Sequence, residues 1–241
     1  MIGILGGMGT QAGLDFCNKL AKLNRGKLDQ QYPMFVLYNK SNTPKRPENL
    51  KKYNNVLKAL VDGCKMLQKN KCKFVVMPCN TAHYWQDDIQ KKIKIPLLSM
   101  PKEVYLHTKK VCKKNSTIGI LCTEATLKTK VYNNYFDKNF RLISPEKKLQ
   151  KNSVNKSIKL VKMGKVKEAE IALRAAVKHL IRKKCKKIVL GCTELPIAIF
   201  AYNSFKKAKE SKLFIDPNLL LAEVCMKNTK GKLFFFIHNK K

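Results

Sequence analysis

Two cysteines stand at matched places in the sequence, each just after a short apolar run. Cys79 follows the run 74–77, Cys192 follows the run 188–190, and a polar turn comes after each cysteine. Short apolar runs that end at polar turn residues predict buried strands. A thiol between a strand end and a helix start faces unpaired backbone N–H groups and a partial positive charge, which favours the thiolate. We therefore expect two reactive thiols rather than two apolar core side chains.

Two thiols on opposite sides of one carbon suit one reaction in particular. Inverting a stereocentre by proton transfer requires a base on one face of the carbon and an acid on the other. A thiolate and a neutral thiol can fill these roles and exchange them for the reverse direction. The neighbouring amide and hydroxyl groups of Asn80, Thr81 and Thr193 can then stabilise the charge that develops on a substrate carboxylate.

The rest of the chain alternates short apolar runs with longer amphipathic segments, which predicts βαβ units and parallel sheets. The expected strands are 2–5, 35–38, 74–77, 97–99, 118–121, 188–190 and 213–215. The expected helices are 11–24, 50–69, 81–92, 102–113, 128–135, 153–162, 167–183 and 217–228. In such sheets ligands bind beyond the carboxyl ends of the strands, where both cysteines are expected.

The sequence also repeats itself. Ile2-Gly3-Ile4-Leu5 recurs as Ile118-Gly119-Ile120-Leu121, and Lys71-Cys72-Lys73 recurs as Lys184-Cys185-Lys186. The two matches occur in the same order and at nearly equal offsets, which indicates an internal duplication rather than a chance likeness of βα units. We expect two pseudo-symmetric α/β domains, each a mostly parallel sheet flanked by helices, with the active site in the cleft between them.

Three segments resemble the signature motifs of the aspartate/glutamate racemase superfamily and fit its aspartate racemase branch best. They are Gly6-Gly7-Met8-Gly9, Pro78-Cys79-Asn80-Thr81-Ala82-His83 and Gly191-Cys192-Thr193-Glu194. The resemblance covers about residues 1–229. It implies a racemase that uses neither pyridoxal phosphate nor a metal, in which Cys79 and Cys192 carry the α-proton of aspartate.

The same resemblance implies further site residues and an assembly. Positions that line the substrate or support the cysteines fall on Met8, Asn80, Thr81, Thr123, Thr193 and Glu194. Arg46 and Lys162 match positions that bind substrate carboxylates, and an arginine fork suits a carboxylate. The family usually forms homodimers. Its chain crossing implies a first domain of 1–97 plus 210–241, completed by the last strand and helix, and a second domain of 98–209.

Departures from the family pattern bear on the substrate. Glutamate racemases typically carry Ser and His where this chain has His83 and Glu194, which favours aspartate. A glutamate racemase, or one that accepts both amino acids, remains an alternative. A related isomerase or decarboxylase is a further alternative, but some of those enzymes keep only one of the two cysteines, so the presence of both in this chain argues against them. Thr10 replaces a common Pro, and the segment 231–241 has no counterpart in the family.

Composition bounds the other functional classes. The 241 residues include 50 Lys+Arg against 16 Asp+Glu, a net charge of +34, which raises nucleic-acid binding as a remote alternative. Only five of the 50 are arginines and the charge is spread along the chain, so we expect solvated helix faces instead. The nine cysteines include no Cys-x-x-Cys pair, and the four histidines have no ligand-like spacing, so no metal site or disulfide scaffold is expected.

A nicotinamide enzyme and a membrane protein are also disfavoured. The segment 7–13 mimics a dinucleotide-binding turn, but the next strand ends at Tyr38-Asn39 without the acidic residue that holds a ribose hydroxyl. No apolar stretch approaches the ~18 residues of a membrane span. Met1 runs directly into a strand pattern rather than a signal peptide. We expect a cytoplasmic enzyme with an amino-acid substrate and without nucleic-acid or membrane partners.

Overall fold

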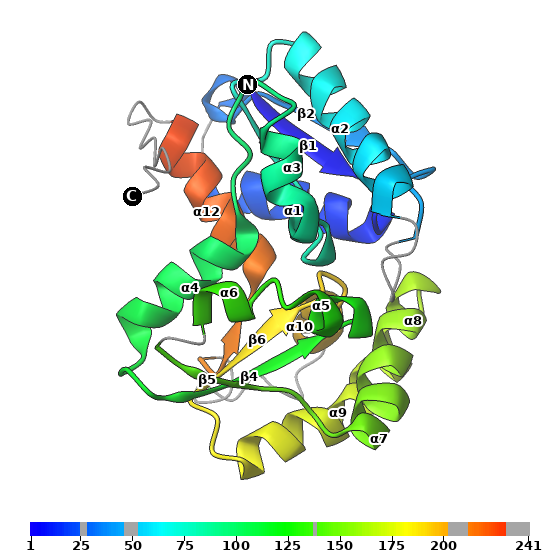
Figure 1. The fold of residues 1–241 in the computed structure, drawn as a ribbon, viewed down its shortest axis with the longest axis vertical. Coiled ribbons are helices and arrows are strands. Elements are labelled where there is room, and N and C mark those ends of the chain that lie inside the picture. The colour runs from blue at the N-terminus through cyan, green and yellow to red at the C-terminus, as the bar shows by residue number, and fades with distance from the viewer. Residues whose placement is uncertain (25–27, 46–52, 137–138, 202–211, 230–241) are drawn as a thin grey trace.

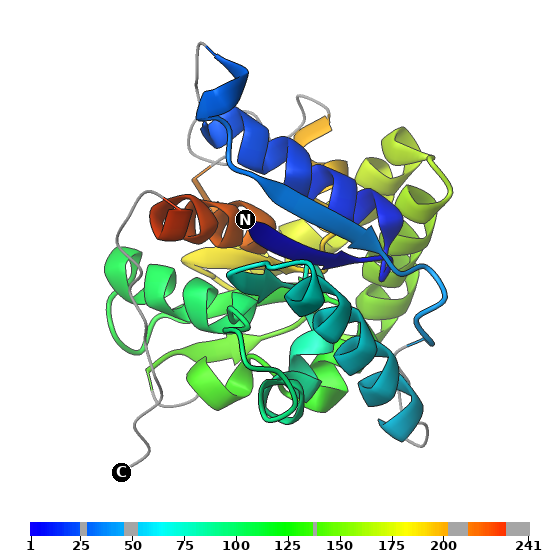
Figure 2. The same cartoon turned by 90° about the horizontal axis from the view of Figure 1, so that it is seen from above.

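Two parallel sheets, one in each half of the molecule, lie among layers of helices (Figures 1 and 2). This computed structural model describes residues 1–24, 28–45, 53–136, 139–201 and 212–229. The first sheet has the order β2-β1-β3, from β1 (Ile2–Gly6), β2 (Phe35–Asn39) and β3 (Phe74–Val76). The second has the order β5-β4-β6-β7, from β4 (Thr117–Cys122), β5 (Arg141–Ile143), β6 (Lys187–Gly191) and β7 (Phe214–Ile215). The predicted fold class is confirmed.

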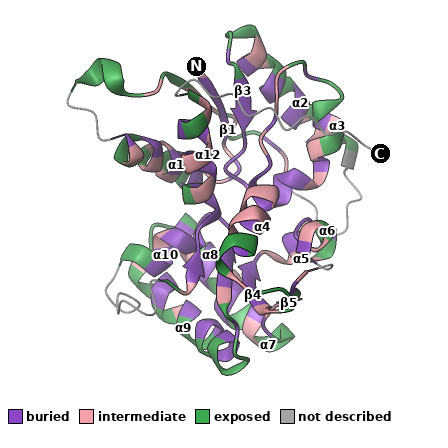
Figure 3. Ribbon diagram, turned by 90° about the vertical axis from the view of Figure 1, so that its left-hand side faces the viewer, coloured by how far each residue is buried: buried purple, intermediate pink, exposed green. Residues whose placement is uncertain are grey.

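Helices cover both sheets, so that the inner strands are mostly buried and the outer helix faces are exposed (Figure 3), whereas the edge strands β2 and β5 are partly exposed. The first half holds α1 (Thr10–Leu23), α2 (Tyr53–Lys69) and α3 (Gln86–Gln90), with 3₁₀ turns η1 (Asp29–Gln31) and η2 (Thr81–Trp85). Then follow α4 (Met100–Val111), α5 (Glu124–Thr129), α6 (Asn133–Phe136), α7 (Lys147–Leu149), the π-helix η3 (Gln150–Asn155), α8 (Lys156–Lys162), α9 (Val166–Arg182), α10 (Leu195–Ala201) and α12 (Pro217–Thr229).

The internal repeat corresponds to equivalent strands. β1 and β4 are the strands that carry the repeated tetrapeptide, and each lies between two parallel neighbours. The Lys-Cys-Lys segments form the same turn after α2 and α9, with Lys71 at φ 58° and Lys184 at φ 57°. A β-carbon on Gly3 would lie 3.2 Å from the Cys72 sulfur, and one on Gly119 would lie 3.2 Å from the Cys185 sulfur. The repeat is therefore a packing unit in which a strand glycine makes room for the turn cysteine.

The two crossing helices join the halves. Met100, at the start of α4, packs in the core of the first half, and Val104, one turn later, packs in the core of the second. The helix α12 returns, and its Leu221 and Cys225 pack with Ile2 of β1. The last helix therefore packs on the core of the first half.

The expectation for the last strand is wrong. β7 pairs with β6, so it extends the second sheet and not the first. The reason is the packing of Phe214, which lies edge-on to Phe200 of α10 at 6.4 Å between ring centroids and is buried with Leu195. The corresponding place beside β3 holds only one bridge, between Val75 and Leu97, where a strand 97–99 was expected.

Three other local expectations change. Helix 81–92 begins as the 3₁₀ turn η2, and helix 128–135 is interrupted at Lys130, whose φ of 53° ends α5. The strand β5 was not anticipated, because the run 141–143 is short and begins with an arginine. Arg46, the first residues of the expected helix 50–69 and the segment 231–241 lie outside the described residues. No helix within the described ranges is long and apolar enough to cross a membrane.

Candidate active site

A small cavity lies between the two halves at the carboxyl ends of their strands. Its free volume is about 30 Å³, enough for one or two water molecules. The residues around it are Met8, Cys79, Asn80, Thr81, Thr123, Lys162, Gly191, Cys192, Thr193 and Glu194. Every site residue that the sequence analysis named and the structure describes therefore lies at this one place. Gly191, from the third motif, joins them.

Equivalent strands of both halves supply the cavity. Met8 and Thr123 follow the central strands β1 and β4, and Cys79 and Cys192 follow their neighbours β3 and β6. The carboxyl ends of parallel strands are where such folds bind ligands, because the connecting turns there leave backbone groups and side chains free. The duplicated topology thus brings two thiols that are far apart in sequence to one cavity.

Cys79 is held through its backbone. Its side chain is buried, and the ring of His83 lies against its carbonyl, with Nδ1 2.9 Å from that oxygen. The other ring nitrogen, Nε2, accepts a hydrogen bond of 3.2 Å from the Met100 N–H at the start of α4. Nδ1 is therefore the protonated nitrogen. Burial lowers the pKa of His83 to about 4, so the ring is neutral.

Cys192 is held through its thiol. The Sγ–H donates to Oε2 of Glu194 at 3.0 Å, and both residues are buried. Burial and then the neighbouring Glu194 carboxylate raise the pKa of the Cys192 thiol well above its ordinary value. The position of Cys192 between a strand end and a helix start therefore does not by itself favour the thiolate. Burial and a carboxylate outweigh the backbone amides of the turn.

The Glu194 carboxylate is the centre of the charged groups at the cavity. Lys162 Nζ, at the end of α8, lies 3.6 Å from its Oε1. Oε1 has no hydrogen-bond partner within the described part of the chain, although it is buried. Gly9, in the turn after β1, lies close to the same oxygen, since a β-carbon added to Gly9 would be only 2.6 Å from it. The glycine of the first motif thus makes room for the carboxylate of the third.

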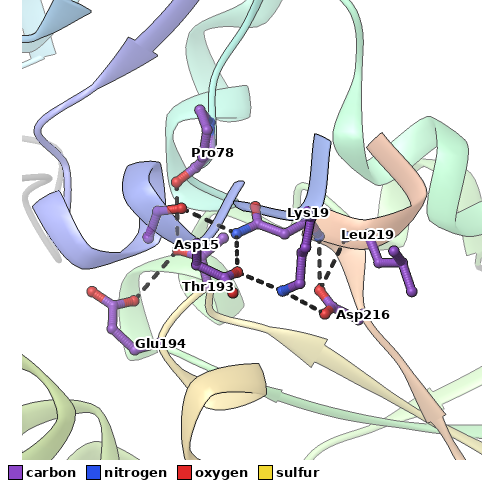
Figure 4. A network of polar contacts seen from close by, with 9 residues as sticks. Asp15, Lys19, Pro78, Thr193, Glu194, Asp216 and Leu219 are labelled. Carbon is purple, nitrogen blue, oxygen red and sulfur yellow. Dashed lines mark hydrogen bonds and ion pairs between the residues drawn. The ribbon is translucent and has the colours of Figure 1, made fainter. Parts of the chain in front are cut away.

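Polar contacts between the halves hold the turn 78–81. Thr193 Oγ1 lies 3.4 Å from the Pro78 carbonyl oxygen and 3.4 Å from Glu194 Oε2, as Figure 4 shows. On the other side, Thr81 Oγ1 lies 2.7 Å from Thr126 Oγ1, a buried pair. The first half therefore presents Cys79 to the cavity on a turn that the second half fixes.

Two further residues of the site were not found from the sequence. Tyr132, in the turn between α5 and α6, donates a hydrogen bond from its hydroxyl to Oδ1 of Asn80. Thr126 contacts Thr81 and also Thr123, whose side chain caps α5. The spacing of Thr123 and Thr126 is that of a helix cap, which is the one signal that could have indicated this pair. No sequence pattern marks Tyr132.

A metal centre has no counterpart among the described residues, since no group of three or more His, Cys, Asp or Glu side chains there is placed to hold an ion. The site is instead a duplicated α/β cleft with one thiol from each half. The model of the Asp/Glu/hydantoin racemase family matches residues 5–225, so this chain belongs to that family.

Individual relatives agree with this assignment. The Picrophilus torridus aspartate racemase structure superposes with a TM-score of 0.81 at 28% identity, covering 96% of this chain and 95% of that one. The broad specificity amino-acid racemase RacX of Bacillus subtilis (strain 168) is 28% identical over 199 residues, which are 81% of this chain and 86% of that protein. Glutamate racemase from Francisella tularensis, solved with D-glutamate, has a TM-score of 0.65 at 18% identity, which shows the shared fold alone.

Proposed function

We propose that this protein is a cofactor-independent racemase that interconverts L- and D-aspartate by proton transfer between two cysteines at Cα. The observation that carries the proposal is the presence of Cys79 and Cys192 at equivalent strand ends around one cavity. Membership of the racemase family supports the reaction type. The likeness to an aspartate racemase at 28% identity supports the substrate.

In each turnover one thiol group removes a proton from Cα and the other delivers a proton to the opposite face of Cα. Cys192 holds its proton at rest, because burial and Glu194 raise the pKa of its thiol. Cys79, as thiolate, takes the Cα proton from one face and becomes the thiol. Cys192 gives its proton to Cα from the opposite face and becomes the thiolate. The enzyme is then in the form that converts the other enantiomer, and either that turnover or proton exchange with water restores the first form.

Substrate carboxylates require cations and neutral donors. Lys162 is half-exposed at the mouth of the cavity and already faces a carboxylate, that of Glu194. The free volume of about 30 Å³ leaves no room for an amino acid, so side chains must move when the substrate binds. We infer that Lys162 then leaves Glu194 and pairs with a carboxylate of the substrate. Asn80, Thr81, Thr123 and Thr193 supply neutral donors beside it. Arg46 is proposed for the second carboxylate.

A chiral assay tests the proposed reaction. The purified protein, without added cofactor, is incubated with L-aspartate, L-glutamate and other L-amino acids in turn, and the enantiomers are separated. We expect D-aspartate to form fastest. Comparable rates for several amino acids would replace aspartate by a broad specificity, as in the relative from Bacillus subtilis. Loss of a carboxylate from the substrate would indicate a decarboxylase, and no change in any amino acid would overturn the proposal.

A homodimer is part of the proposal. The segment that leads into β2, at the edge of the first sheet, exposes four large apolar side chains: Leu28, Tyr32, Met34 and Phe35. Met34 is 73% exposed and Phe35 is 41% exposed, and such a patch at a sheet edge favours a protein partner. Light scattering should give twice the mass of 27.6 kDa for the wild type. It should give a smaller mass for Met34→Lys, and a monomeric wild type would contradict the dimer.

A cytoplasmic location without nucleic-acid or membrane partners completes the proposal. The nine cysteines are all free thiols, which fits a reducing compartment. The lysine excess accounts for the remote alternative of nucleic-acid binding, and a gel shift distinguishes the two. We expect any shift to vanish as salt rises through the physiological range, because contacts made by charge alone release counterions. A complex that survives physiological salt would contradict this part of the proposal.

A further inference from the structure

Asn80 has a buried donor that nothing in the described structure uses. Its side chain lines the cavity and the residue is 2% exposed, yet Nδ2 has no hydrogen-bond partner among the described residues. Buried polar groups are nearly always paired, because an unpaired one loses its bonds to water without replacement. An unpaired N–H donor at the wall of a cavity therefore indicates a ligand acceptor at that place.

The other end of the same amide is fixed. The Tyr132 hydroxyl donates to Asn80 Oδ1, and this bond crosses from the second half of the molecule to the first. The Tyr132 ring is 2% exposed and packs edge-on against Phe136, at 6.0 Å between centroids. Burial raises the pKa of Tyr132 well above its ordinary value, so the hydroxyl keeps its proton and can only donate to a carbonyl oxygen.

An asparagine amide has an acceptor end and a donor end, and rotation by half a turn exchanges them. A donor on the protein side selects the orientation in which Oδ1 faces the protein and Nδ2 faces the cavity. Without that donor the amide can rotate and present its oxygen to the cavity, where it would repel a carboxylate.

We propose that Tyr132 is a positioning residue that holds the Asn80 amide with its N–H groups toward a carboxylate oxygen of the bound amino acid. The inference rests on the proposed racemase function. Removal of the Cα proton moves negative charge onto that carboxylate, so a donor already aimed at the oxygen stabilises the transition state more than the bound substrate. Tyr132 itself touches neither the substrate nor the cavity.

The first test compares two matched substitutions. Tyr132→Phe removes the hydroxyl and keeps the ring against Phe136. Tyr105→Phe is the control, because Tyr105 packs against the same Phe136 at 5.7 Å and its hydroxyl accepts a bond of 2.8 Å from Asn139, away from the cavity. We expect Tyr132→Phe to lower kcat for aspartate by about tenfold to hundredfold, the usual effect of one hydrogen bond to a charged group. KM should change less, and Tyr105→Phe should match the wild type. Equal activities of the two variants would overturn the inference.

A double-substitution cycle separates positioning from general structural damage. If Tyr132 acts through the amide, adding Tyr132→Phe to Asn80→Ala should cause no further loss of kcat. A full additional loss in the Asn80→Ala background would show that Tyr132 acts by another route and would overturn the inference. Thermal unfolding of each variant, followed by circular dichroism, verifies that the fold is kept.

Binding of an unreactive dicarboxylate keeps the test independent of the reaction. Succinate is titrated into ¹⁵N-labelled protein while the side-chain amide signals of Asn80 are followed. We expect these signals to shift in the wild type and in Tyr105→Phe, and to shift less or broaden in Tyr132→Phe. A wild type that binds succinate in this way but racemises no amino acid would overturn the proposed function and leave the role of Tyr132 supported. No shift at Asn80 in the wild type would overturn that role.

Discussion

The Cys192 thiol donates to the Glu194 carboxylate at 3.0 Å, two residues further along the same turn. The carboxylate also faces Lys162, at 3.6 Å from Nζ. The Glu194 side chain therefore contacts both the Cys192 thiol and the Lys162 ammonium group, which is proposed to bind a substrate carboxylate. Since burial and Glu194 together raise the pKa of Cys192, the second half of the molecule holds its thiol protonated.

Glu194→Gln should lower the pH at which Cys192 becomes reactive. The carboxylate repels the thiolate and accepts a hydrogen bond from the neutral thiol, and both effects raise the pKa of the thiol. The measurement is the pH dependence of Cys192 alkylation by iodoacetamide, read by peptide mass spectrometry. Glu124→Gln is the control, because Glu124 accepts a hydrogen bond of 2.6 Å from the Asn155 side chain and is not among the residues around the cavity. An unchanged pH profile in Glu194→Gln would show that Glu194 does not control the thiol.

Replacing either cysteine of the pair by Ser should lower racemisation by about a hundredfold or more, the usual contribution of a general acid or base. In deuterated water the two variants should differ in which enantiomer exchanges its Cα proton, because each retains the thiol on one face only. Cys112→Ser, at the end of α4 and away from the cavity, should behave as the wild type. Retained racemase activity in Cys192→Ser would contradict the two-thiol mechanism.

Lys162→Met should raise KM for aspartate by about tenfold or more, since a charged hydrogen bond is lost. The matched control is Lys159→Met. Lys159 is exposed on the same helix α8 but does not line the cavity, so both variants remove one charge from the same surface. In a chain of net charge +34, a general attraction of anions would make the two variants alike. A specific contact predicts that only Lys162→Met is affected, and equal KM values would contradict it.

Much of the fold could be predicted from patterns in the amino-acid sequence. The repeated tetrapeptide and the repeated Lys-Cys-Lys segment reflect a glycine–cysteine packing unit used twice, at Gly3 with Cys72 and at Gly119 with Cys185. Such a unit needs a glycine on the strand and a small apolar residue on the turn. Because it depends on residue types alone, it can be recognised in the sequence. The same holds for the motif cysteines, whose places at strand ends follow from chain order.

Other features depend on contacts that residue types do not encode. A two-residue strand such as Phe214–Ile215 can extend either sheet, and the packing of Phe214 on Phe200 decides between them. The protonation of Cys192 depends on burial and on the direction of the Glu194 side chain, which chain order does not give. Tyr132 reaches Asn80 across the two halves, so neither its neighbours nor its spacing indicate that bond.

Two glycines of the first motif should fail in different ways when changed to Ala. Gly7 has φ +86°, and a β-carbon there would lie 2.3 Å from the Lys40 backbone, so Gly7→Ala should cost about 1–3 kcal/mol of stability or more. Gly9 has an extended φ of 169°, and its β-carbon would come too close only to the flexible end of Glu194, with the Ala12 β-carbon at an ordinary contact distance of 3.7 Å. Gly9→Ala should therefore keep the melting temperature and lose racemisation. The reverse pattern of melting temperature and activity would contradict this assignment.

The neutral His83 ring should make stability fall in mild acid. Its pKa is about 4 in the folded protein, against 6.5 for an unperturbed His, so between these values the unfolded chain binds more protons. Stability from this group is complete above about pH 6.5 and is lost as the pH falls toward 4. The loss between about pH 7.5 and pH 5 should be about 2 kcal/mol. Urea unfolding at both pH values measures it, and His83→Gln, which cannot titrate, should lose correspondingly less. An equal loss in the variant would show that His83 is not the group responsible.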